Sequence, residues 1–153
     1  RLSKMITGKF MTSNDDIEKV LEIRGKVFPG SGTRDEIDTL AIYALTFSED
    51  GQPGSSGRLF MDDDNVVTID LVGTVPELRC QGLGDLVMRM LLYRVLEMEL
   101  PMVKLDAPAE LVPFFARYGL KPTDAQSGGL VRMAAPNAEI NIEGTCKHCP
   151  GAQ

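Results

Sequence analysis

One short segment of the chain carries the residue types that bind phosphate groups. Arg79-Cys80-Gln81-Gly82-Leu83-Gly84 places an arginine beside two glycines. Glycines let the backbone approach a ligand closely, and the N–H groups at a helix N-terminus attract an anion. The segment therefore predicts a site for a phosphorylated ligand, in which backbone N–H groups and the arginine make the contacts.

The elements on either side of this segment are predicted to be a strand and a helix. Residues Val66 to Val75 are rich in β-branched side chains and are followed by Pro76, which ends a strand. From Leu83 to about Leu100 the apolar residues recur at helical spacing, and Pro101 ends the pattern. The segment thus joins the end of a strand to the N-terminus of an amphipathic helix.

The remaining pattern indicates a single α/β domain of the α+β type. The further predicted elements are strands at 5–11, 40–47, 56–61, 102–105 and 130–134, and helices at about 13–27 and 110–118. A chain of 153 residues can bury one sizeable core. We place the domain at residues 1–135 and treat residues 136–153, which hold few large apolar groups, as a C-terminal tail.

The composition narrows the classes of partner. The formal net charge of -6 disfavours nucleic acid and anionic membranes, and it favours cationic amines as ligands. The sequence has no apolar run long enough to cross a bilayer, and its first residues lack the hydrophobic core of a signal peptide. We therefore expect a cytoplasmic protein that binds neither nucleic acid nor membranes.

The glycine segment is also compatible in part with a dinucleotide-binding fingerprint. That fingerprint needs a third glycine and an acidic residue about twenty positions further on. Gly82, Gly84 and Asp106 fit it, but Val87 stands in the place of the third glycine. Because no second run of alternating strands and helices follows, a dinucleotide-dependent oxidoreductase is the less favoured interpretation.

Two segments resemble the signatures of a known family. Residues 72–84 resemble the strand, Pro-Glu turn and Arg-x-x-Gly-x-Gly/Ala motif of the GNAT superfamily of N-acetyltransferases, and Pro113 to Leu120 is similar to their Pro-Phe-Tyr-x-x-x-Gly-Phe segment. Residues 24–28, 35–38 and 57–59 are similar to a small bacterial branch of that superfamily. The resemblance spans about residues 4–134, so the tail takes no part in it.

The resemblance implies a mixed, mostly antiparallel sheet, flanked by helices and splayed open where acetyl-CoA, the cosubstrate, binds. The pantetheine arm would pair with the backbone of Val72, Gly73, Thr74 and Val75. The pyrophosphate would take the N–H groups from Arg79 to Asp85, and Phe115 would also contact the cosubstrate. The implied reaction moves the acetyl group to the primary amine of a small, cationic substrate by direct attack in a ternary complex.

The family also implies where a proton donor for the leaving thiolate would stand. Relatives place a tyrosine at the third position of the second segment, but that position is Phe115 here. Tyr118, about one helical turn further on, is our candidate donor. The backbone N–H near Thr74 resembles the group that polarises the acetyl carbonyl in this family.

The general base is open to several interpretations. Relatives that modify protein lysines place a glutamate on the central strand, and the corresponding position is Thr68. Asp70 shares its strand face, so we name Asp70 and, from the preceding loop, Glu36 as candidates. Asp38 is a further candidate, although Asp35, Glu36 and Asp38 also fit a solvated loop or the cap of a short helix. A non-catalytic, acyl-CoA-binding sensor remains the alternative function.

The tail holds a cluster that the resemblance does not explain, Cys146-Lys147-His148-Cys149. A closed zinc site needs four ligands, and one tail supplies three, so we expect no metal in a single chain. A mobile tail is the favoured interpretation. The alternatives are a homodimer in which two tails complete a four-thiolate site, and a pair of thiols that cycles as a disulfide.

Overall fold

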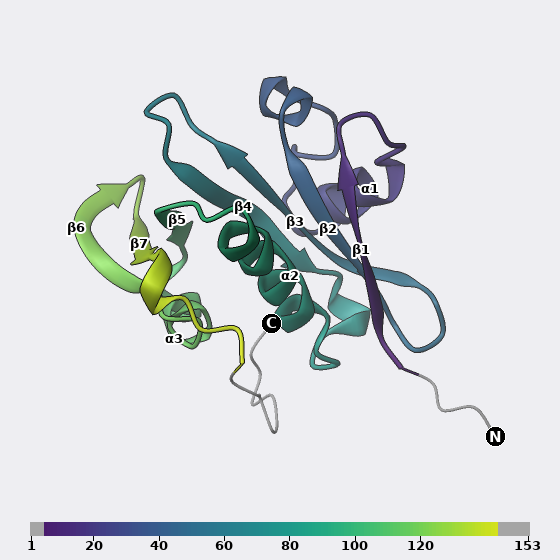
Figure 1. Cartoon of the computed structure of the whole chain (residues 1–153). Helices are drawn as coiled ribbons and strands as arrows, with labels where there is room; N and C mark the ends of the chain where they lie inside the picture. The colour runs from purple at the N-terminus through teal and green to yellow at the C-terminus, as the bar shows by residue number, and fades with distance from the viewer. Residues whose placement is uncertain (1–4, 144–153) are drawn as a thin grey trace.

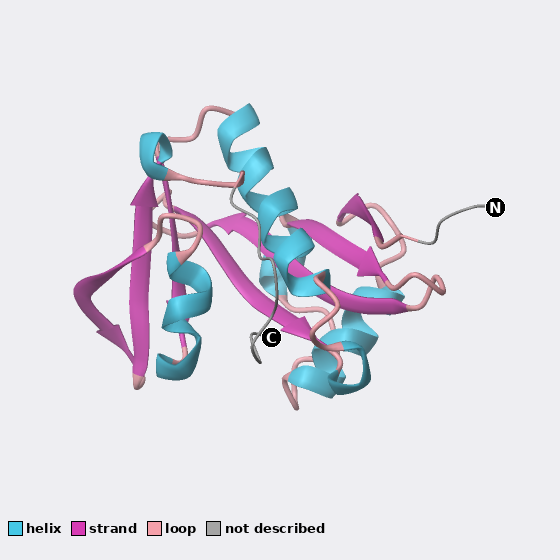
Figure 2. Ribbon diagram, turned by 90° about the horizontal axis from the view of Figure 1, so that it is seen from below, coloured by secondary structure: helices cyan, strands magenta, loops and turns pink. Residues whose placement is uncertain are grey.

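The structure, a computed structural model, describes residues 5–143, which form one sheet with helices on both of its faces (Figures 1 and 2). The sheet has seven strands in the order β1-β2-β3-β4-β5-β7-β6. The strands are β1 (Thr7–Thr12), β2 (Ile42–Phe47), β3 (Pro53–Met61), β4 (Val67–Thr74), β5 (Met102–Ala107), β6 (Lys121–Ser127) and β7 (Leu130–Pro136). The α-helices are α1 (Glu18–Val27), α2 (Leu83–Glu97) and α3 (Val112–Ala116). The 3-10 helices are η1 (Glu36–Thr39), η2 (Pro76–Leu78), η3 (Ala109–Leu111) and η4 (Asn137–Glu139).

The strands pair antiparallel everywhere except between β4 and β5. Those two strands are parallel, and their register consists of one pair, Thr68 and Lys104. Beyond this pair the two strands diverge, so the sheet is splayed beside the C-terminal half of β4 (Figure 2). The predicted fold class, a mixed and mostly antiparallel sheet flanked by helices, is confirmed.

Two apolar clusters fix the helices to the sheet. Helices α2 and α3 pack on one face, where the largest buried cluster includes Val87, Leu91 and Phe114. Helix α1 packs on the opposite face through a second cluster that includes Val20 and Ile23. A Cβ at Gly57 of β3 would lie 2.8 Å from Val87, so α2 approaches the sheet as closely as a glycine permits.

Several elements differ from their prediction: β3 begins three residues earlier, the helix predicted at 110–118 divides into η3 and α3, and α1 and β6 differ most. Helix α1 begins at Glu18, later than expected, because the acidic residues before it stabilise a turn: the Asp15 carboxylate accepts the N–H of Thr12 and that of Asp16 accepts the N–H of Glu18. Strand β6 was not predicted. Its first five residues are exposed at the edge of the sheet, so they carry no apolar alternation that would indicate a strand.

The described part of the predicted tail continues from β7 and lies against the domain. The N–H of Asn141 donates to the carbonyl of Tyr118 over 2.9 Å, and Arg89 of α2 donates to the carbonyl of Ile142 over 3.1 Å. Residues 146–149, with the cysteine and histidine cluster, lie outside the described residues. Among residues 5–143, no helix is long and apolar enough to span a membrane.

Candidate functional site

The loop between β4 and α2 contains two residues in the left-handed conformation. Cys80 has φ 63° and Gly82, the N-cap of α2, has φ 85°. Left-handed residues within such a turn direct neighbouring N–H groups into one concavity. Cys80 has a Cβ, so its left-handed conformation costs on the order of 1 kcal/mol, and strain of this kind is concentrated at functional sites.

The N–H groups of this loop are free of backbone partners. Within the described part of the chain, no N–H from Cys80 to Asp85 donates to a backbone carbonyl, and the first hydrogen bond of α2 runs from Leu86 to Gly82. The Nε of Arg79 donates to the carbonyl of Thr74 over 3.2 Å, which ties the loop to the end of β4. Free donors, a helix dipole and an exposed arginine together suit a phosphate group.

A β-bulge reshapes β4 next to this loop. The register between β3 and β4 passes from Ser56 and Gly73 to Arg58 and Asp70, so β4 has one extra residue across from Gly57. Leu71 lies in the bulge with φ 52°. Bulges bend a strand and redirect its side chains, and this one stands where β4 leaves β5.

A cavity of about 90 Å³ lies between the splayed strands. It is lined by Phe28, Ile69, Asp70, Leu71, Val72, Leu105, Asp106, Pro108, Leu111 and Phe115. The structure thus brings together three of the predicted site residues, Asp70, Val72 and Phe115, around one apolar space with two carboxylates. The second carboxylate, Asp106, was assigned no role in the favoured interpretation, and it accepts hydrogen bonds of 2.5 and 3.3 Å from Arg132 of β7.

Asp70 belongs to a charged network beneath the cavity. Both of its oxygens accept hydrogen bonds of 2.8 Å from Arg58, which is buried and also contacts Asp35 at 2.7 Å and Asp38 at 3.1 Å. Arg24 contacts Asp38 at 2.9 Å. Two guanidinium groups thus face three carboxylates, which leaves one net negative charge. Because Asp70 is 33% exposed, part of this charge can attract a cation into the cavity.

Asp38 is the structural centre of this network. It forms a capping box with Asp35 at the start of η1, as the interpretation of a helix cap predicted, and it accepts a hydrogen bond of 2.6 Å from Tyr43. Burial alone would raise the pKa of Asp38, but the hydrogen bonds from Tyr43 and Arg24 hold that pKa well below its usual range. Asp38 therefore stays ionised and fixed in place.

Glu36 and Tyr118 are not among the residues that line the cavity. Glu36 is exposed on η1 and faces a different groove. The Tyr118 hydroxyl donates to Asp85, at the N-terminus of α2, over 2.5 Å, and Arg117 donates to the same hydroxyl over 3.3 Å. Burial and the bond to Asp85 raise the pKa of Tyr118 far above the physiological range, so its phenol keeps its proton.

Some ion pairs around the site could have been predicted from the sequence, and others could not. The pair between Asp85 and Arg89, at 3.0 Å, follows the i, i+4 spacing of a helix and could have been predicted. The contacts that Arg58 makes join three distant segments. Nothing in the local sequence around Arg58 indicates them.

Comparison with solved structures relates this architecture to one fold. No protein-family model matches the chain. Similar solved structures include an acyl-CoA N-acyltransferase from Pseudomonas aeruginosa (24% identity, TM-score 0.72) and ElaA from Escherichia coli (22%, 0.73), each match covering 86% of this chain and 99% of the other. A GNAT family acetyltransferase from Elizabethkingia anophelis with acetyl-CoA bound matches with 12% identity and a TM-score of 0.69, over 86% of this chain and 97% of that one. The chain therefore has the fold of the GNAT acetyltransferases, as its resemblance predicted.

Proposed function

We propose that this chain, which has the GNAT fold, is an N-acetyltransferase that moves an acetyl group from acetyl-CoA to the primary amine of a small, cationic substrate. One observation carries the proposal: the loop with free N–H groups at the start of α2 lies directly after the strand that borders the splayed cavity. This juxtaposition suits a long ligand with a phosphorylated end and a reactive end.

The residues present fit acetyl-CoA. The pyrophosphate would lie on the N–H groups of residues 80–85, with Arg79 beside it and the positive end of the α2 dipole behind it. The pantetheine arm, which resembles a peptide, would pair with the backbone of residues 72–75, where β4 has left β5. The acetyl group would then reach the cavity that contains Asp70 and Phe115.

The chemistry needs a neutral amine, a polarised carbonyl and a proton for the leaving thiolate. The amine nitrogen forms a bond to the acetyl carbon, the bond from that carbon to sulfur breaks, and the amine loses a proton. Holding both reactants in one cavity supplies a large part of the rate acceleration. The N–H near Thr74 would polarise the carbonyl, as the family resemblance suggests.

Asp70 is the best supported of the predicted catalytic residues because it is the one among them that lines the cavity. We assign it two tasks: to attract the cationic amine, and to accept a proton from that amine through water. The role of Tyr118 as proton donor and that of Glu36 as base stay predictions, which kinetics of Tyr118→Phe and Glu36→Gln would test. The cytoplasmic location and the homodimer stay predictions as well.

Thermal unfolding with three ligands tests the proposed cosubstrate. Acetyl-CoA at 100 times its Kd should stabilise the protein by about 2.7 kcal/mol. For a chain of this size that raises Tm by about 5–11 °C. CoA should stabilise as well, and NADH should have no effect. Stabilisation by NADH alone would contradict the proposal and favour a dinucleotide-dependent oxidoreductase.

Gly84→Val should abolish the stabilisation by acetyl-CoA, because its side chain would stand where the backbone has to approach the phosphates. Met98→Val, which places the same side chain at the exposed far end of α2, is the matched control and should keep the full shift. Circular dichroism checks that both variants fold. A folded Gly84→Val protein with wild-type affinity in calorimetry would refute this placement.

A sensor that binds acyl-CoA without turnover is the second candidate function. Phe115 favours it, because this side chain lines the cavity at the position of the family's tyrosine and has no proton to give. Stabilisation by CoA species without release of CoA thiol across a panel of amines would support the sensor.

A further inference from the structure

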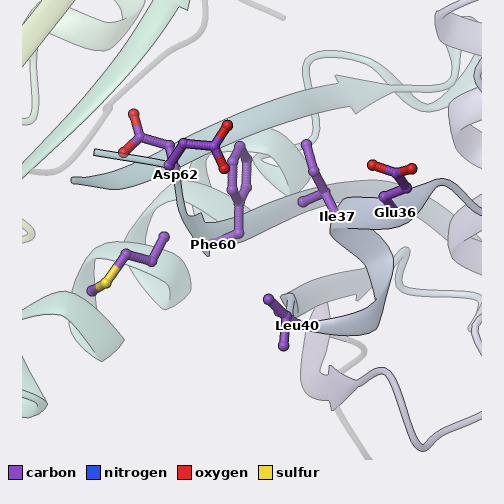
Figure 3. A pocket seen from close by; sticks show the side chains of 7 residues that line it. Glu36, Ile37, Leu40, Phe60 and Asp62 are labelled. Carbon is purple, nitrogen blue, oxygen red and sulfur yellow. The ribbon is translucent and has the colours of Figure 1, made fainter. Parts of the chain in front are cut away.

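A second hollow lies on the face of the sheet that α1 covers, between η1 and the end of β3 (Figure 3). Its volume is about 430 Å³. We call it the η1 groove and define it by its lining residues, Glu36, Ile37, Leu40, Phe60, Met61, Asp62 and Asp63.

The middle of the η1 groove is apolar. Figure 3 shows Phe60 and Ile37 between Asp62 on one side and Glu36 on the other, with Leu40 beside them. Leu40 is 80% exposed and Met61 is 48% exposed. Single exposed apolar residues are common on protein surfaces, but several that share one hollow indicate a ligand with an apolar body.

The ends of the η1 groove are acidic. Asp62 is already paired with Lys104 of β5. Glu36 and Asp63 are exposed, and neither forms a salt bridge with any residue in the described range 5–143. Two unneutralised carboxylates beside an apolar floor suit a ligand that is both apolar and positively charged.

The η1 groove and the proposed acetyl-transfer cavity share no lining residue, but they are neighbours on the sheet. Arg58 of β3 stands opposite Asp70 of β4, and Phe60 stands opposite Thr68, so Phe60 and Asp70 are diagonal neighbours. Such neighbours are about 7–8 Å apart. The guanidinium of Arg58 binds Asp70 and also lies over the Phe60 ring, 5.4 Å from its centroid. One arginine thus forms the boundary between the two spaces.

We propose that the η1 groove binds the distal part of the acceptor, and that the acceptor is a long-chain diamine. This inference rests on the proposed acetyltransferase function. The reacting amine lies near Asp70, the alkyl chain crosses Phe60 and Leu40, and the second ammonium group ends beside Asp63. Asp62, which follows the last residue of β3, lies four residues beyond Arg58, and this corresponds to a span of about 13 Å. A compact polar amine would leave the apolar floor uncovered.

Steady-state kinetics with diamines of different length test this inference. With acetyl-CoA saturating and CoA release as the readout, KM for 1,10-diaminodecane should be at least about tenfold lower than KM for 1,4-diaminobutane, a difference of about 1.4 kcal/mol. Decylamine, which lacks the second charge, should lie between them. Equal KM values for the two diamines would overturn the inference and leave the acetyltransferase function intact.

Calorimetric titration of 1,10-diaminodecane into the protein gives a readout that is independent of turnover. Binding is expected even if no amine in the panel is acetylated, and in that case the proposed function fails while the η1 groove is supported. Absence of binding would overturn the inference, whatever the turnover of other amines.

Two groove variants and two matched controls locate the binding. Leu40→Asn and Asp63→Asn change exposed side chains, so both should fold, and each should raise KM for 1,10-diaminodecane about five- to tenfold more than KM for 1,4-diaminobutane. Met98→Gln and Glu49→Gln make the same kinds of change at exposed positions outside the groove, and they should leave both KM values unchanged. Wild-type KM values in both groove variants would contradict the placement.

Discussion

Replacing Asp38 by asparagine should destabilise the fold strongly, although it alters a single atom of the side chain. Oδ1 of Asp38 accepts hydrogen bonds from Arg24, Arg58 and Tyr43, at 2.9, 3.1 and 2.6 Å. Oδ2 accepts the N–H of Asp35 at 2.8 Å. Asparagine keeps one acceptor oxygen, loses the negative charge and turns a donor toward an N–H group or toward the arginines.

The loss of stability in Asp38→Asn depends on the hydrogen-bond and ion-pair partners that Arg24 and Arg58 keep. Arg58 keeps Asp70 and Asp35 as partners, whereas Arg24 keeps two backbone carbonyls and one carboxylate oxygen of Asp35 at 4.0 Å. Breaking a buried ion pair costs about 3–5 kcal/mol. Because part of the network survives, we expect the lower value, about 3 kcal/mol, which corresponds to a fall in Tm of about 6–12 °C.

The difference in free energy of unfolding between wild type and Asp38→Asn should also depend on pH. The folded-state pKa of Asp38 is lowered, so its contribution is fully present above the unfolded pKa of about 3.9 and is lost as the pH falls through the folded pKa. The difference in stability between wild type and Asp38→Asn should be constant from about pH 5 to 7. It should shrink by about 1.3 kcal/mol at pH 3, where an unfolded carboxyl is mostly protonated.

Urea unfolding of both proteins at pH 7, 5 and 3 measures these values. Glu49→Gln, which removes an exposed carboxylate from a turn, is the control and should change stability by less than about 0.5 kcal/mol. A loss below about 1 kcal/mol for Asp38→Asn at pH 7, or a loss that does not depend on pH, would refute the assignment of Asp38 as the buried centre of the network.

Two further substitutions test the packing around the site. Gly73→Ala should lower the free energy of unfolding by about 1–3 kcal/mol, because a Cβ there would lie 2.6 Å from Val27 and 3.0 Å from Phe28. It should also weaken binding of acetyl-CoA in calorimetry. Unchanged stability would show that α1 does not pack on β4 as described. Tyr118→Phe should lower the free energy of unfolding in urea by about 1.5 kcal/mol, because it removes the hydroxyl that donates to Asp85. An unchanged free energy of unfolding would contradict that hydrogen bond.

The sequence predicted the parts of the site that depend on short-range patterns. The order of strand, glycine loop and amphipathic helix, on which the proposed phosphate site depends, was predicted from residues 66–100 and is confirmed. The left-handed conformation of Cys80 was not predicted. Glycine at position 82 suggests a left-handed turn. Cysteine rarely adopts a positive φ, so the sequence does not indicate that residue 80 also has one.

The parts that were not predicted depend on contacts between distant segments. Arg58, Asp35 and Asp70 come from a strand, a loop and a second strand, and folding alone brings them together. The hydrogen bond of Tyr118 to Asp85 crosses 33 positions of sequence and gives this tyrosine a structural contact in addition to its proposed chemical role. Register and packing, which local patterns do not contain, decide such pairs.

The proposed activity of the chain is the transfer of acetyl groups from acetyl-CoA to amines. The most direct measurement incubates the protein with acetyl-CoA and a panel of small cationic amines, and quantifies free CoA thiol and acetylated amine by mass spectrometry. If the chain has this activity, both products form in equal amounts, with long-chain diamines as the preferred acceptors, and Gly84→Val forms neither. Failure of the folded wild-type protein to acetylate any amine in the panel, with no CoA released above the uncatalysed rate, would contradict it.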